Sequence, residues 1–451
     1  METIIAEIAG RFIKNICGII TSGGSFPQIE APALREAKAC AAQLMSVYAE
    51  KVDEAMVADR TSRREAGYSV ERRGDERRIQ TMLGEVSYQR TYFQKAAGGY
   101  EYLADTVLGV DKRERVSGGL SLSLVRAAKE LSYAKSSFYL TDGAISRQTV
   151  MGKLRQSCSQ KPIAGGRRQV AELHIDADED HVTMVGGRKS IVPLISVYEG
   201  IEKRGKRGVC RNVFHISEYG KSPDELWEQA LSAVEERYDL DGTRIYLHGD
   251  GADWIKQGLE WFPGAIFVLD KHHKNKAILS MTAGLSPAGR MLFDTAIRRS
   301  LACSDIALFD RMTAGVCESQ LGRTEKVLQN AGYLKTHIDG ISVCTKDPAA
   351  NNGGCTEPHV SHVLSARLSS RPMAWSKRTL KQFAPMLAGG DVRKTPSPTT
   401  SSLPAPLKKA AASAKRAFRR GTAGLPAPNA IGTLPLSGKV TGTQILLKQF
   451  A

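Results

Sequence analysis

The sequence lacks any CxxC cysteine pair, although eight cysteines are scattered along its 451 residues. This spacing excludes the common zinc-finger arrangements and is typical of reduced thiols in a cytoplasmic protein. No apolar run is long enough to cross a bilayer: the stretch Ile13–Ile20 is interrupted by Lys14 and follows Glu7 and Arg11, whereas a spanning helix needs about 20 apolar residues. We therefore expect neither a signal peptide nor a membrane partner.

Acidic residues are missing altogether after Asp391. The chain there is rich in Pro, Ser and Thr over residues 396–406 and then in basic residues, namely Lys408, Lys409, Lys415, Arg416, Arg419 and Arg420. Such a segment has little apolar surface to offset its ordering entropy, so residues 390–451 are predicted to form a disordered basic tail. The formal net charge of +16 favours a nucleic acid partner over a merely soluble basic protein.

The N-terminal third predicts two regions. Residues 1–65 have apolar positions at helical spacing, which predicts an N-terminal helical region. Alternation over Ile79–Tyr92 around Gly84 predicts a β-hairpin or strand pair at the start of a second region, residues 66–160. A basic cluster precedes the alternation, formed by Arg72, Arg73, Arg77 and Arg78. It contacts phosphate in one interpretation and forms a solvated charged turn in the other.

Residues 117–156 predict helices. The turn Asp142-Gly143 is followed by a capping Ser146 and a short helix in which Arg147 and Gln148 are exposed. This succession of a turn, a capping residue and a short helix is typical of a helix–turn–helix, and an ordinary helical hairpin explains it as well. With the β element, these helices define the predicted DNA-binding region.

Residues 168–275 alternate between strand and helix patterns. Strands are predicted at Val170–Ala177, Ile191–Val197, Val209–Ile216, Arg244–Leu247 and Ile266–Leu269, with helices beginning at Ser222-Pro223 and over Ala252–Trp261. The order βββαβαβ predicts an α/β ribonuclease H-like core. Residues 276–350 predict a helical insertion, so that the whole catalytic domain would extend over residues 168–385.

Acidic residues stand at three places where this fold could use them. Asp176, Asp178, Glu179 and Asp180 stand at the end of the first predicted strand, Asp250 lies in the segment Gly249–Gly251 after a later strand, and Glu357 follows the loop Gly353-Gly354. Carboxylates hold Mg²⁺, and two cations neutralise the attacking and leaving oxygens of phosphoryl transfer. The glycines beside Asp250 would leave room for a phosphate backbone. For each acid alone, solvation or helix capping is an alternative.

Several stretches together resemble one family of bacterial proteins. They are ADEDHV at Ala177–Val182, GDGADWIK at Gly249–Lys256, LDKHHKNKAI at Leu269–Ile278, SHVLSARLSSRPMAWS at Ser361–Ser376 and TMLGEVSYQRTYF at Thr81–Phe93. Over roughly residues 60–385 the chain resembles the ISLre-type insertion-sequence transposases, bacterial DDE enzymes once filed as an uncharacterised protein family. Any one of these stretches alone would carry little weight.

The resemblance implies cleavage and strand transfer of DNA by a ribonuclease H-like domain with two divalent metals, Mg²⁺ or Mn²⁺. The family's catalytic and metal-binding acids correspond to Asp178, Asp250 and Glu357. Asp176 competes with Asp178, which is favoured because it lies within the matching ADEDHV stretch. The expected partners are element-end and target DNA, and a homo-oligomer is expected on DNA.

Two positions depart from the family pattern. Pro358 stands where the family usually has Gly, and His272 where it usually has an aromatic residue. Two alternatives therefore stay open: a catalytically decayed, DNA-binding descendant of a transposase, and a metal-dependent nuclease on the same fold. Other residues have both a functional and a structural interpretation. They are His272 and His273, and the candidate phosphate contacts Arg367, Arg371 and Lys377. We expect the tryptophans Trp254 and Trp375 in the core.

Overall fold

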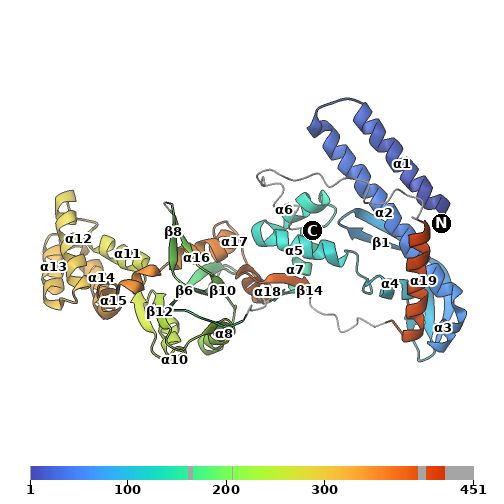
Figure 1. Ribbon diagram of the computed structural model, residues 1–451. Coiled ribbons are helices and arrows are strands. Elements are labelled where there is room, and N and C mark those ends of the chain that lie inside the picture. The colour runs from blue at the N-terminus through green and yellow to red at the C-terminus, as the bar shows by residue number, and fades with distance from the viewer. Residues whose placement is uncertain (1, 161–165, 206, 395–402, 422–451) are drawn as a thin grey trace. The chain divides into compact units, whose positions relative to one another are not determined.

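The computed structural model describes residues 2–160, 166–205, 207–394 and 403–421. These residues form two compact units. The first contains the chain up to Ser117 together with the C-terminal helix α19 (Ala405–Gly421), and the second contains residues 118–396 (Figure 1). None of the described helices is both long and apolar enough to span a membrane.

The first unit combines helices with one three-stranded sheet. Its elements are α1 (Glu2–Thr21), α2 (Phe26–Ala58), α3 (Arg60–Glu65), β1 (Tyr68–Thr81), β2 (Gly84–Lys95), β3 (Tyr100–Glu101), α4 (Leu103–Val107) and α19. The long helix α2 begins with a capping box formed by Ser25 and Gln28, and Pro27 occupies its first turn, where the missing N–H costs nothing. Its buried Val52 and Met56 pack against Tyr68 and Phe93 of the sheet.

The observed hairpin is longer than the alternating stretch Ile79–Tyr92 from which it was predicted. β1 and β2 pair antiparallel from Tyr68–Lys95 to Thr81–Gly84 and are joined by two residues, and Gly84 has a φ of +107°, which a side chain would strain. The arginine cluster therefore lies in a strand rather than in a turn. The predicted 66–160 region is also divided, because the hairpin belongs to the first unit and the helices after Ser117 to the second.

The C-terminal segment differs from its prediction. Residues 391–394 form strand β14 (Asp391–Lys394), paired antiparallel with β4 (Ser157–Gln160), and residues 405–421 form α19. The prediction of disorder is wrong for these two stretches. Composition suggested too little apolar surface, but Leu407, Ala410 and Ala414 recur on one face and are buried against α2 and its neighbours. Residues 395–402 and 422–451 of the predicted tail lie outside the described residues.

The second unit is built on an open five-stranded sheet with the strand order β10-β7-β6-β12-β13. The strands are β6 (Glu172–Thr183), β7 (Lys189–Tyr198), β10 (Phe214–Ile216), β12 (Arg244–Gly249) and β13 (Ile266–Leu269). β7 runs antiparallel to β6 and β10, whereas β12 is parallel to β6 and β13. The single strand predicted over Val209–Ile216 is instead β10 and part of the separate hairpin β8 (Ile201–Arg204) and β9 (Arg207–Cys210).

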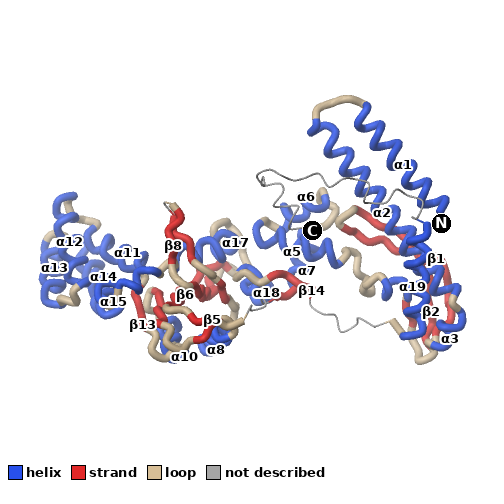
Figure 2. The backbone as a smooth tube through the Cα atoms, in the orientation of Figure 1, coloured by secondary structure: helices blue, strands red, loops and turns tan. Residues whose placement is uncertain are grey.

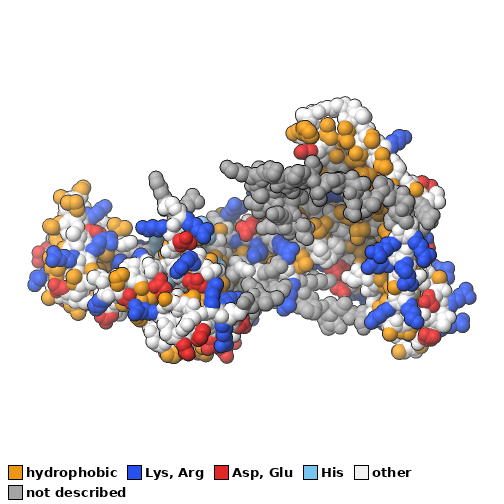
Figure 3. Space-filling view, in the orientation of Figure 1, with side chains coloured by type: hydrophobic (Ala, Val, Ile, Leu, Met, Phe, Trp, Pro, Cys, Tyr) orange, Lys and Arg blue, Asp and Glu red, His pale blue; other side chains and the backbone are white. Residues whose placement is uncertain are grey.

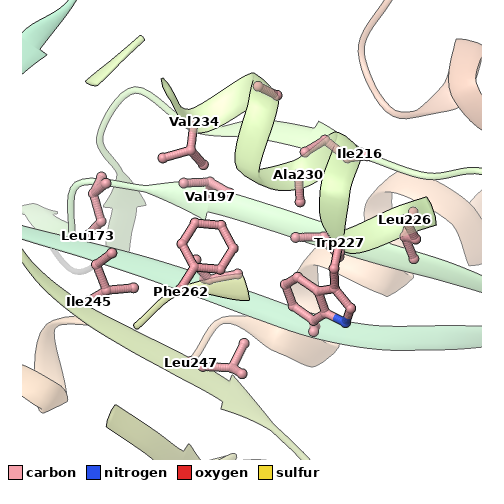
Figure 4. Close-up of a cluster of buried hydrophobic side chains, with 14 of the residues drawn as sticks. Leu173, Val197, Ile216, Leu226, Trp227, Ala230, Val234, Ile245, Leu247 and Phe262 are labelled. Atoms are coloured by element: carbon pink, nitrogen blue, oxygen red, sulfur yellow. The ribbon is translucent and has the colours of Figure 1, made fainter. Parts of the chain in front are cut away.

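One face of this sheet is covered by α8 (Pro223–Glu235) and by the short helices α9 (Asp253–Lys256) and α10 (Gly258–Trp261). Ser222 and Glu225 form a capping box at the start of α8, as expected for this sequence. Trp227 of α8 is fully buried and packs with Phe262 and with Ile245 and Leu247 of the sheet (Figure 4). Tyr238 of the short parallel pair β5 (Arg168–Gln169) and β11 (Tyr238–Asp239) also belongs to this core.

The predicted insertion is helical throughout its regular elements (Figure 2). It contains α11 (Lys271–Thr282), α12 (Pro287–Ala302), α13 (Ile306–Glu318), a 3₁₀ turn (Leu321–Arg323), α14 (Thr324–Thr336), α15 (Ile338–Lys346) and a second 3₁₀ turn (Pro348–Asn352). Apolar side chains at helical spacing, among them Ile278, Ile297, Phe309 and Leu334, form a separate buried cluster. The insertion therefore has a core of its own and rests on the sheet edge through β13.

The remaining helices of the second unit pack on the five-stranded sheet, on the strand pair β4–β14 or on one another. They are α5 (Gly118–Glu130), α6 (Tyr133–Thr141), α7 (Arg147–Arg155), α16 (Thr356–Val360), the π-helical turn Ser361–Ser365, α17 (Ala366–Leu368) and α18 (Lys377–Leu387). Arg155 of α7 donates hydrogen bonds to Thr379 and Ser376 at 2.9 and 3.0 Å. These contacts explain why α5–α7 belong to the second unit and not to the unit that contains the hairpin of β1 and β2.

Candidate functional site

The acid-rich strand β6 has two different faces. Leu173, Ile175 and Ala177 belong to the hydrophobic core beneath the sheet. Because side chains of a strand alternate, the opposite face carries His174, Asp176, Asp178 and Asp180, all of them buried. The acids were predicted to stand at the end of this strand, but β6 continues to Thr183, so they lie within it. A fixed strand backbone places each carboxylate more precisely than a loop would.

Asp178 and Asp250 come together through strand register. β12 is parallel to β6, with His248 opposite Asp176. Asp178 lies two residues further along β6, and Asp250 lies two residues beyond His248, one residue past the end of β12. The charge of Asp250 acts on Asp178, which agrees with this proximity. The structure therefore brings together two of the three acids singled out in the sequence.

Asp178 is only 9% exposed. Burial raises the pKa of its carboxyl to about 6, and the negative charge of Asp250 adds to this increase. A 2.8 Å hydrogen bond from the backbone N–H of Glu179 and the nearby His273 act in the opposite direction. A buried carboxylate beside a second carboxylate favours a positive charge at this place.

Asp176, the competitor of Asp178, is fully engaged within the protein. The Tyr198 hydroxyl donates to both of its oxygens, at 2.9 and 3.0 Å, and the backbone N–H of Cys355 donates to Oδ2 at 2.8 Å. His359 Nδ1 lies 3.2 Å from the same oxygen. Asp176 is 1% exposed, so it holds the start of α16 to the sheet and has little room for a ligand.

Asp180 is also held by neighbouring residues. Ser365 and Ser369 donate hydrogen bonds to its Oδ1 at 2.9 and 2.7 Å. Both serines belong to the stretch SHVLSARLSSRPMAWS. Asp176, through Cys355, and Asp180, through the two serines, therefore hold the chain on both sides of Glu357 to β6, and Asp178 stands between them.

Asp270 and His273 extend the site. Asp270 caps α11: its Oδ2 accepts the backbone N–H groups of His272 and His273 at 2.8 and 3.2 Å and lies 3.2 Å from His273 Nδ1. That hydrogen bond is the main reason why the pKa of His273 is raised, and the charges of Asp178 and Asp250 contribute. The protonated imidazole is therefore favoured among three carboxylates. Sequence reasoning weighed His273 against solvent exposure, and the Asp-x-x-His spacing was the signal for its pairing with Asp270.

Asp270 itself stays ionised. Burial disfavours its charge, but hydrogen bonds from His273 and from the Thr356 hydroxyl, at 2.8 Å, outweigh this and keep the pKa of Asp270 below its ordinary value. Sequence reasoning did not single out Asp270 as a site residue.

The loop at Asp250 is tightly surrounded by the helical insertion. The Tyr333 hydroxyl donates a 2.7 Å hydrogen bond to the backbone carbonyl of Asp250, and Asp250 Oδ1 accepts the N–H of Ala252 at 2.8 Å. Gly251 has a φ of +92°, and a Cβ there would meet the ring of His337. The expectation that the glycines leave room for a phosphate backbone is wrong on the side where a Cβ would stand, because protein atoms fill that space.

Glu357 does not join the two aspartates. It lies in the first turn of α16 after the N-cap residue Cys355, with Pro358 next in the same turn, and its side chain is exposed. The helix begins where expected and accepts the proline. Within the described residues, no group of three or more His, Cys, Asp or Glu side chains is arranged to hold a metal ion. The three predicted ligands are thus not preassembled.

Several other expectations are resolved by packing. Arg367 is 8% exposed and donates to the carbonyl of Ala128 at 2.8 Å, so it is a structural residue and not a phosphate contact. Trp375 is buried, and Trp254 packs against the core and donates to Glu179 at 2.7 Å. Trp375 is a core residue, as expected, whereas Trp254 is only partly buried at the edge of the core.

The arginine cluster of β1 has partners within the protein. Arg72 pairs with Asp75 at 2.9 Å and Arg78 with Glu76 at 2.8 Å. Arg77 donates to the carbonyls of Asp111 and Glu114. The pairing reduces the charge that this cluster offers to a phosphate.

The predicted helix–turn–helix pattern is present as a local structure. Asp142 ends α6 in the left-handed conformation, and the Ser146 hydroxyl accepts the N–H of Thr149 at 3.2 Å to begin α7. Arg147 and Gln148 are exposed. Phe138 and Tyr139 of α6 are 61% and 67% exposed beside them.

These features define a mixed α/β protein with an acid-bearing face on an open sheet and a helical insertion next to it. The chain belongs to UPF0236, an uncharacterised protein family whose model matches residues 19–395. It is 34% identical to the UPF0236 protein TTE2489 of Caldanaerobacter subterraneus subsp. tengcongensis, over 76% of this chain and 75% of that protein.

Two further relatives belong to the same family. A second protein of that organism, whose name joins a series of designations from TTE0033 to TTE2212, is 32% identical over 87% of this chain and 85% of its own length. A UPF0236 protein of Streptococcus gallolyticus, named for its position in the vanSb 3′ region, is 24% identical over 73% of this chain and 74% of its own length.

Proposed function

We propose that this chain is a DDE-type DNA transposase that cleaves and joins the ends of an insertion sequence. The observation that carries the proposal is the proximity of Asp178, in β6, to Asp250, in the loop directly after the adjacent parallel strand β12. Phosphoryl transfer on DNA requires carboxylates that converge on one point, and a rigid sheet with the loop that follows one of its strands supplies two of them.

The strand order supports this proposal. Numbered along the chain, the five strands lie in the order 3-2-1-4-5, with only the second antiparallel to its neighbours. We take this to be a ribonuclease H-like core, with the first acid on its central strand and the second after the neighbouring strand. The helical insertion would then separate the second acid from Glu357.

The site chemistry fits a divalent cation such as Mg²⁺ or Mn²⁺. Asp178 and Asp250 would hold it, and its charge would offset the repulsion and burial that now raise the pKa of Asp178. Glu357 would be the third ligand and would have to turn inward from its exposed position. When bound, such ions neutralise charge on the reacting phosphate oxygens. His273 lies close enough to these acids that its positive charge lowers the pKa of Asp178, while the charges of Asp178 and Asp250 raise the pKa of His273.

The names of relatives add an independent argument. One relative bears a series of designations within a single organism. Repetition of one protein within a genome is what multiplication of an insertion sequence would produce.

A second candidate function has a specific observation in its favour. Glu357 is exposed, and Pro358 follows it where the resembled family has Gly. A descendant that has lost catalysis but still binds DNA would tolerate both features. A metal-dependent nuclease on the same fold would instead cleave DNA without joining it.

A cleavage and joining assay separates these candidates. The full chain is incubated with Mg²⁺ or Mn²⁺ and with duplexes that carry the DNA flanking its gene. We expect end-specific cleavage and joining by the wild type. Cleavage activity should fall by at least roughly 100-fold in Asp178→Asn, Asp250→Asn and Glu357→Gln, since even the replacement of a residue that only supports a metal ligand costs roughly 10–100-fold. Asp241→Asn, an exposed acid before β12, is the matched control and should retain activity.

The outcomes are distinct. Cleavage of unrelated DNA without joining would favour the nuclease. Binding of the ends without cleavage would favour the decayed protein, and recovery of cleavage in Pro358→Gly would then identify the proline as the disabling change. Full activity of Asp250→Asn would refute the proposed site.

A further inference from the structure

Helix α19 presents a strongly basic face. Its exposed side chains include six cations, namely Lys408, Lys409, Lys415, Arg416, Arg419 and Arg420. The helix contains no acidic residue. Leu407, Ala410 and Ala414 bury the opposite face against α2, and Phe418 lies edge-on to Tyr48 with ring centroids 5.2 Å apart. The packing therefore fixes the direction in which the cations point.

More positive charge stands next to α19. The helix contacts α3, where Arg60 and Arg64 are exposed. Arg63 of the same helix is buried, and its pKa is lowered first by burial and then by the like charges of Arg60, Arg73 and Arg64. The acids Asp59 and Glu65 at the ends of α3 offset only part of this charge. Figure 3 shows the Lys and Arg side chains gathered over α19 and α3.

A membrane surface fits this helix poorly. A basic helix that lies on a bilayer inserts an apolar face between the lipids. The apolar side of α19 is already buried within its own unit, since Leu407 is 0%, Ala410 3% and Ala414 2% exposed. Only the cationic side remains, and such a surface suits a polyanion whose charges are regularly spaced.

We propose that α19 and α3 form a binding surface for the phosphate backbone of duplex DNA, independent of base sequence. A helix of 17 residues is about 25 Å long, which is enough to follow roughly seven base pairs. The surface lies largely on residues beyond the family match, which ends at residue 395. The surface would thus be an addition of this chain. The proposal rests on the proposed function only for the choice of DNA as the polyanion.

Binding by the metal-free full chain to a duplex of arbitrary sequence, measured by fluorescence anisotropy over a salt series, tests this surface. The variant Lys408→Gln/Lys409→Gln/Lys415→Gln/Arg416→Gln keeps good helix formers and removes four charges. We expect at least a tenfold loss of affinity at low salt. The slope of log affinity against log salt should fall by up to about 3.6, since each phosphate contact contributes about 0.9.

The matched control removes four exposed charges from helices of the other unit, as Arg299→Gln/Arg311→Gln/Lys326→Gln/Lys346→Gln. It changes net charge equally and should keep the wild-type affinity and slope. Circular dichroism checks that both variants keep the helix content of the wild type. Equal losses in the two variants, or none in the α19 variant, would overturn the proposal. So would tighter binding to anionic phospholipid vesicles than to DNA at the same salt.

This assay contains no metal and measures no cleavage. A failure of the proposed catalytic function would leave the binding result unchanged. Conversely, loss of the α19 surface would leave Asp178 and Asp250 in place, so the two failures are distinguishable.

Discussion

The Thr356 hydroxyl donates a 2.8 Å hydrogen bond to Asp270 Oδ1, and both residues are almost completely buried, at 1% and 2% exposure. The bond joins the first residue of α16, which carries Glu357, to the residue that caps α11 and pairs with His273. The position of Glu357 relative to the aspartates therefore depends on a contact between segments 86 residues apart.

The first prediction concerns this bond. Thr356→Val keeps the shape of the side chain but leaves a buried carboxylate oxygen without its donor. We expect the free energy of unfolding to fall by about 1–3 kcal/mol, measured by urea denaturation. Thr356→Ser retains the hydroxyl and is the control, which should lose less. Equal stability of the Val variant and wild type would show that water replaces the bond.

The second prediction distinguishes Asp176 from Asp178. Asp176 accepts hydrogen bonds from Tyr198 and from the N–H of Cys355, and an amide in its place would present an NH₂ group to donors. Asp176→Asn should therefore destabilise the fold by about 1–3 kcal/mol or more. Asp178→Asn removes a buried charge and should not destabilise the metal-free protein. The reverse order in thermal denaturation would assign the structural role to Asp178.

The third prediction is a dependence on pH. The pKa of Asp178 is raised from 3.8 to about 6 in the folded protein. As pH rises from about 4 to 6, the unfolded chain releases this proton before the folded one, so this residue lowers stability through that window and keeps it lowered above pH 6. Asp178→Asn should remove the loss and stabilise the protein by on the order of 3 kcal/mol at pH 7.

Urea denaturation in the presence of a chelator, from pH 4 to pH 7.5, measures this difference. The advantage of Asp178→Asn over wild type should grow between pH 4 and 6 and then level off. A constant difference across the range would contradict the raised pKa. Added Mg²⁺ should stabilise the wild type more than the variant if the site binds the ion.

The fourth prediction concerns the loop that holds Asp250. Gly251→Ala must place a Cβ against the His337 ring at a φ of +92°, which we expect to cost more than the roughly 1–2 kcal/mol of left-handed strain alone. The change should also displace Asp250 and reduce cleavage. Gly242→Ala is the matched control, because Gly242 has a φ of +73° but no atom within 4 Å of its Cβ position. Equal effects of both changes on stability would show that the contact with His337 relaxes.

Local signals in the sequence were sufficient for many elements. Ser222, Pro223 and Glu225 give the start of α8 by capping chemistry, and the helices of residues 276–350 follow from apolar spacing. β6 was recognised but ended too early, because buried acids interrupt its apolar pattern although its pairing with β7 continues to Thr183. The C-terminal helix was not predicted, because its few apolar residues stabilise it only by packing against the surface of α2.

The sequence by itself determined which chemical groups are present and roughly which elements carry them: a strand that ends in acids, Asp250 in a Gly-flanked turn, and Glu357 at the start of a helix. Only the tertiary structure decided their roles. Register set Asp250 beside Asp178, hydrogen bonds from Tyr198 and Cys355 engaged Asp176, and packing left Glu357 exposed. The physical reason is that burial, hydrogen-bond partners and charge proximity are properties of segments far apart in the chain, which local propensities do not encode.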